Sequence, residues 1–137
     1  MTDAVPARTS WVPMIGLFLA QILMSYNVSA LPVSLGGMVA DFRVPPTDVS
    51  TAIVTYGLVV AALVMVGAKI GQRLGWVLVF RVVVAVFAVS ALLMIFAPSV
   101  GWVILAQALA GASAAIIVPS LVALIAENYH GPQQATA

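Results

Sequence analysis

The sequence contains no cysteine and very few charged side chains. Only 7% of its 137 residues are Asp, Glu, Lys or Arg, whereas a soluble globular domain has about 25%. The missing cysteines exclude disulfides, thiolate metal ligands and cysteine nucleophiles. Five basic and four acidic side chains give a net charge of +1, which leaves no basic patch to meet nucleic-acid phosphates. A soluble enzyme and a nucleic-acid-binding protein are therefore both excluded.

Hydrophobic residues are abundant, at 64% of the sequence with a mean hydropathy of +1.19. A transmembrane helix needs about 20 mostly apolar residues, and charge-free stretches cover residues 9–40, 49–68 and 82–126. Pro98 and Gly101 break the last stretch into two. The sequence therefore predicts an all-α integral membrane protein, a bundle of four transmembrane helices at 11–35, 47–70, 76–96 and 100–126, between an N-terminal tail (1–10) and a C-terminal tail (127–137).

Basic residues near helix ends set the orientation of a membrane protein, because they are retained on the cytoplasmic side. Here they divide four to one, with Arg43 on one side and Arg8, Lys69, Arg73 and Arg81 on the other. We therefore expect a multi-pass protein of the plasma (inner) membrane with both termini in the cytoplasm. A cleaved signal peptide ending near Ala30 is the weaker alternative, since the apolar run continues beyond that residue.

The predicted membrane interior holds no Asp, Glu, Lys, Arg or His deep in a span. Ionisable residues at such depth are costly and are functional by default, so their absence argues against a self-contained proton relay. The chain also offers no nucleophile beside a base, no set of metal ligands and no phosphate-binding loop. We expect neither an enzyme nor a cofactor or metal site.

Uncharged polar residues are the remaining candidates for a site. Gln21, Ser25 and Ser29 recur every four positions and so share one face of the first predicted helix. Asn27 lies off that face, and Gln107 lies in the fourth helix. Interhelical hydrogen bonds, which are worth about 1 kcal/mol each in lipid, are the favoured interpretation. The alternative is that these side chains line a substrate path.

Small residues mark one face of the fourth predicted helix. Ala106 and Ala110 form one small-xxx-small pair, and Gly111 and Ala115 form another. Such pairs let helix backbones approach closely where lipid provides no hydrophobic drive. They predict tight packing of this helix, without naming its neighbour.

Four stretches along the chain resemble the motifs of one transporter family. They are Ser-Ala-Leu-Pro at 29–32, Tyr-Gly-Leu at 56–58, the loop 69–75 with Lys69, Gly71, Arg73 and Gly75, and the segment 105–115 followed by Pro119. In this order they resemble the major facilitator superfamily, and most closely its 14-helix drug:proton antiporter branch. The resemblance implies the start of a major facilitator fold and a role in membrane transport.

The chain departs from the family pattern at its charged positions. Leu23 stands where the family motif has an Asp in the first helix, and Gln107 stands where it has an Arg in the fourth. In the loop, Gln72 replaces the motif's Asp and Trp76 replaces a basic residue. The resemblance therefore implies the family fold without proton coupling in these helices.

Because only four helices are predicted, three hypotheses about function are considered. Family transporters have 12 or 14 helices built from three-helix repeats, with substrate sites between repeats or halves. We first expect a degenerate accessory subunit that packs against other transmembrane subunits of a larger transport complex. The alternative is the N-terminal part of a transporter that exports hydrophobic or amphiphilic compounds, whose partner is the remainder of that transporter. A self-assembling four-helix multidrug carrier is disfavoured, because such carriers rely on an acidic residue in the first helix.

Overall fold

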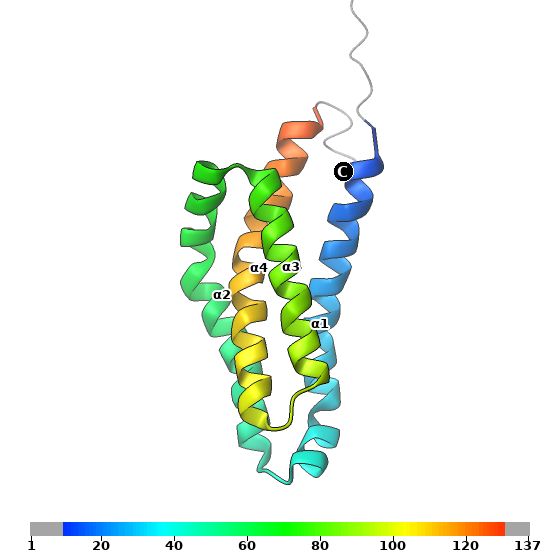
Figure 1. Ribbon diagram of the computed structural model, residues 1–137, viewed down its shortest axis with the longest axis vertical. Helices are drawn as coiled ribbons and strands as arrows, with labels where there is room; N and C mark the ends of the chain where they lie inside the picture. Colours follow the sequence, from blue (N-terminus) through cyan, green and yellow to red (C-terminus); the bar gives the residue numbers. More distant parts are fainter. Residues whose placement is uncertain (1–9, 131–137) are drawn as a thin grey trace, which may run out of the picture.

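The computed structural model describes residues 10–130 and consists of four long antiparallel helices (Figure 1). Each helix is long and apolar enough to cross a membrane. Within the described residues there is no strand. The predicted all-α class and its four membrane helices are therefore confirmed, with α1 at Val12–Phe42, α2 at Pro46–Leu74, α3 at Trp76–Ile95 and α4 at Val100–Asn128.

Three of the helices run further than the spans predicted for them, whereas α3 ends at Ile95, one residue before its predicted end. The first helix was predicted to end at residue 35 but continues to Phe42, where Arg43 adopts a left-handed conformation (φ 53°). The second begins at Pro46 and ends at Leu74, so the prediction of 47–70 was short at both ends. The fourth also continues to Asn128, past 126. The predicted bounds followed charge, yet charged residues continue a helix freely outside the hydrocarbon core.

The two ends of α2 have clear local causes. Pro46 occupies the first helical position, where its missing N–H costs nothing and its fixed φ suits a helix. At the other end Gly75 has a φ of 89°, a conformation that side chains rarely tolerate. Gly75 N donates a hydrogen bond to Gly71 O at 3.0 Å, which closes the last turn. This single residue therefore separates α2 from α3.

The core of the bundle lies around α4. Helices α2 and α3 pack along it, and α1 approaches the group mainly through Leu17, Ala20, Met24 and Leu31. Met24 joins the larger core cluster with residues of α3 and α4, whereas Leu31 meets Ala52 and Val103 in a smaller one. Large apolar side chains remain exposed over all four helices. In a membrane these surfaces face lipid or further helices.

Candidate functional site

Helices α2 and α4 pack with their backbones in close contact. A Cβ atom at Gly111 would lie 2.7 Å from Tyr56 O, and one at Gly67 would lie 2.8 Å from Ala115 O. Only glycine allows backbones this near to each other. The structure places the four predicted packing residues in buried positions, and it identifies α2 and α3 as the neighbours of α4: Ala106, Ala110, Gly111 and Ala115.

The loop motif between α2 and α3 divides into exposed charges and a buried glycine. Lys69, Arg73 and Gly75 are exposed, whereas Gly71 is buried. The ring of Trp76 lies directly against Gly71, in the space that a side chain there would need. At position 76, where the family motif has a basic residue, the aromatic ring of Trp76 packs the start of α3 onto the end of α2.

The polar stripe of α1 lies on a face that the other three helices leave uncovered. Gln21, Ser25 and Ser29 are all exposed. Together with Met24 and Val28 they line a shallow groove of about 340 Å³. Their polar groups are therefore available to a partner or a solute, and none of the described helices packs over them.

Asn27 and Gln107 point instead into the bundle, where the structure brings them to one small cavity between α1, α2 and α4. The cavity has a volume of about 40 Å³, and Tyr56 also lines it. Gln107 is only 2% exposed, and its Nε2 donates a hydrogen bond to Met94 Sδ at 3.5 Å. The Oδ1 atom of Asn27 is buried and accepts no hydrogen bond. The five predicted polar residues thus form two separate groups.

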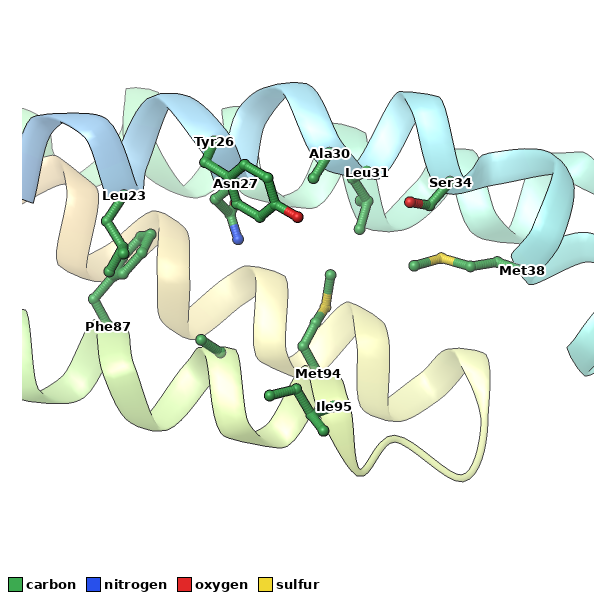
Figure 2. Close-up of a pocket in the computed structure, with 11 residues that line it drawn as sticks. Leu23, Tyr26, Asn27, Ala30, Leu31, Ser34, Met38, Phe87, Met94 and Ile95 are labelled. Atoms are coloured by element: carbon green, nitrogen blue, oxygen red, sulfur yellow. The ribbon is translucent and has the colours of Figure 1, made fainter.

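A larger cavity of about 420 Å³ opens between α1 and α3 (Figure 2). Its walls are mostly apolar, and Figure 2 shows Leu23 and Phe87 at one end with Met94 and Ile95 further along. Leu23 stands where the family motif has an acidic residue, so the cavity presents no charge at that point. Such a space accepts apolar groups.

Buried serines are polar residues that the sequence analysis did not select. Ser90 donates to Phe87 O at 2.6 Å, Ser113 to Leu109 O at 3.0 Å and Ser120 to Ile116 O at 2.7 Å. Each hydroxyl is satisfied by a carbonyl of its own helix, a common arrangement that leaves no donor free for a ligand. Among the described residues no group of His, Asp or Glu is placed to hold a metal ion.

A contact between the start of α1 and the end of α4 was also missed. The rings of Trp11 and Tyr129 stack with centroids 5.3 Å apart, and Tyr129 Oη donates to Ser10 O at 3.0 Å. Tyr129 is fully buried, although we had assigned it to a C-terminal tail. Interfacial aromatic residues were the only available signal. The rest of both tails, 1–9 and 131–137, lies outside the described residues.

Within the described residues, four apolar helices with an uncharged interior and an uncovered polar face on α1 define a polytopic membrane protein. Comparison with known families makes this specific. The chain belongs to the Major Facilitator Superfamily, whose family model matches residues 17–137. The resemblance seen in the four sequence motifs is therefore confirmed. No solved structure gives a significant match to the chain.

Several curated proteins are similar to nearly the whole chain. The multidrug efflux pump LfrA of Mycolicibacterium smegmatis is 34% identical over 124 residues, which is 90% of this chain and 24% of the pump. The lincomycin resistance protein of Streptomyces lincolnensis is 27% identical over 90% of this chain and 26% of its own length. The puromycin resistance protein pur8 of Streptomyces alboniger is 28% identical over 88% of this chain and 24% of its own length.

These relatives change the order of our hypotheses. Their names describe efflux and resistance, and none describes an accessory subunit. The accessory-subunit hypothesis therefore gains no support, and the transporter alternative fits better. The chain spans about a quarter of the length of these relatives.

Proposed function

We propose that this chain supplies the first four transmembrane helices of a major facilitator exporter of hydrophobic or amphiphilic compounds. The observation that carries the proposal is the match of about nine-tenths of the chain to efflux and resistance proteins. Substrate sites in this family lie between repeats and between halves. These four helices would therefore form one wall of the path, and further helices would form the rest.

The uncovered face of α1 is the part of the wall that suits a solute. Gln21, Ser25 and Ser29 provide neutral donors and acceptors beside apolar surface. A compound with a large apolar body and a few hydrogen-bonding groups matches this composition, because binding sites combine apolar lining with few polar groups. We therefore assign the stripe to the substrate path.

Proton coupling would have to come from outside these helices. Within the described part of the chain, Asp41 lies at the end of α1, Asp48 in the first turn of α2 and Glu127 at the end of α4. Each carboxylate is near a membrane surface, and none is placed midway across. The lack of a carboxylate between the helix ends supports the proposal that these helices do not carry the coupling proton.

Orientation follows from charge and from the bundle geometry. The α2–α3 connection, with Lys69 and Arg73, lies at the same end as the start of α1 and the end of α4 (Figure 1). Arg43 lies at the opposite end. We propose that the protein lies in the plasma membrane and that the end with Lys69 and Arg73 faces the cytoplasm, because basic residues are retained on that side. A reporter that fluoresces only in the cytoplasm, fused after Arg43 and after Arg73, tests this: signal from the Arg43 fusion alone would reverse the assignment.

The transport proposal is tested with the polypeptide at the length its gene encodes. Purified protein is reconstituted in liposomes, and the movement of a lipophilic fluorescent dye, lincomycin and puromycin is measured with and without a proton gradient. We expect export of at least one compound. Replacing Gln21 by Leu and Ser25 by Ala should weaken export, whereas Val82→Ala on the exposed side of α3 should not. Purification with a separate transporter and no export by itself would favour the accessory subunit instead.

A further inference from the structure

The small cavity between α1, α2 and α4 contains unused hydrogen-bonding capacity in the middle of the bundle. Asn27 Oδ1 is buried without a donor. A buried polar atom without a hydrogen-bond partner is unfavourable, and native structures rarely contain one. Gln107 Nε2 has a partner, but that partner is a thioether sulfur, which accepts hydrogen bonds weakly. Both side chains line the same cavity.

The volume of the cavity identifies a suitable occupant. About 40 Å³ is available, and one buried water needs roughly 10–15 Å³ together with two to four polar partners. The lining provides the amides of Asn27 and Gln107 and the phenol residue Tyr56, beside apolar Val28, Leu31 and Ile53. No carboxylate lines the cavity, so nothing there compensates the charge of a cation.

We propose that a single water molecule occupies this cavity and bridges Asn27 Oδ1 to the amide of Gln107. The water donates one hydrogen bond to Asn27 Oδ1 and accepts one from Gln107 Nε2, which turns from Met94 Sδ toward it. Because α1 and α4 begin successive three-helix repeats of this family, the water joins the two repeats through neutral groups. This site is distinct from the exposed stripe assigned to the substrate path.

Oxidative footprinting with X-ray pulses tests the proposal, because hydroxyl radicals formed from a bound water label the side chains beside it. The full-length protein is placed in lipid nanodiscs, which keep bulk water from its lipid-facing surface. Tyr56 should be oxidised in the unmodified protein. Oxidation of Tyr56 should be lost in Asn27→Leu and in Gln107→Leu, and kept in Ser29→Ala, which changes the same helix on its exposed face.

Tyr26 provides an internal control, since it lines the larger α1–α3 cavity and not the small one. Its labelling should be unchanged in Gln107→Leu. Absence of Tyr56 oxidation in the unmodified protein, with Trp102 oxidised at the membrane end, would overturn the proposal and favour a direct bond between the two amides. Persistence of Tyr56 oxidation in both leucine variants would overturn it too.

Rapid mixing with H₂¹⁸O keeps the test decisive if the leucine variants do not fold. A bound water exchanges more slowly than bulk water, so ¹⁸O should enter Tyr56 later than it enters Trp102. Simultaneous incorporation at the two residues would contradict a bound water.

Discussion

Helices α1 and α4 are of similar length and both are apolar enough to cross a membrane, but they are packed very differently. In the most apolar stretch of α4, 44% of the residues are buried, whereas in that of α1 only 17% are buried. The sequences explain the difference, because α4 places Ala110, Gly111 and Ala114 toward its neighbours while α1 exposes Phe18 and Val33. Apolarity alone therefore locates a membrane helix, and the distribution of small residues determines which helix becomes the centre.

The largest predicted effect comes from filling the α2–α4 contact. In Gly111→Leu the new side chain would start 2.7 Å from Tyr56 O, which is backbone and cannot move aside. Overpacking costs about 1–3 kcal/mol where neighbouring side chains can adjust, but the backbone of Tyr56 cannot, so we expect loss of folding. Gly16→Leu on α1, where nothing lies within 4 Å, is the matched control. Thermal unfolding in detergent measures both, and equal losses would contradict the central position of α4.

A smaller loss of stability is expected when a buried isoleucine of α4 is shortened, and almost none when an exposed isoleucine of α1 is. Ile117 of α4 is 1% exposed, and Ile117→Ala should cost about 2–5 kcal/mol because it leaves a cavity. Ile15 of α1 is 60% exposed, so Ile15→Ala should change stability by less than about 0.5 kcal/mol within these four helices. Unfolding is compared between the chain alone and the full-length protein. A large cost at Ile15 only in the latter would show that further helices cover α1.

The smallest predicted effect concerns the attachment of α1 to α4. Tyr129→Phe keeps the ring stacked on Trp11 but removes the hydrogen bond to Ser10 O. A net loss of about 0.5–1.5 kcal/mol follows from one hydrogen bond. Proteolysis near residue 10 should become faster, while unfolding of the α2–α4 pair should not change. An unaltered proteolysis rate would mean that the bond does not hold α1.

The sequence was sufficient for the number and class of helices, since charge-free stretches reveal them directly. It could not name the neighbour of Gly111, because a small residue allows close approach without specifying the partner. It placed Asn27 off the face shared by Ser25 and Ser29, but it could not say which of the two faces is covered, since that depends on which helices pack against α1. The stacking of Tyr129 on Trp11 joins residues far apart in the chain, and no local pattern encodes such a pairing.

The hydrogen bond between Tyr129 and Ser10 has a consequence for the order in which the helices pack during synthesis. Its partners are 119 positions apart, and translation proceeds at about 5–20 residues per second. The first helix to leave the ribosome must therefore wait on the order of ten seconds before the aromatic ring that fastens its end has been made. During that interval α1 is held by lipid and by its contacts with α2, such as Leu31 against Ala52.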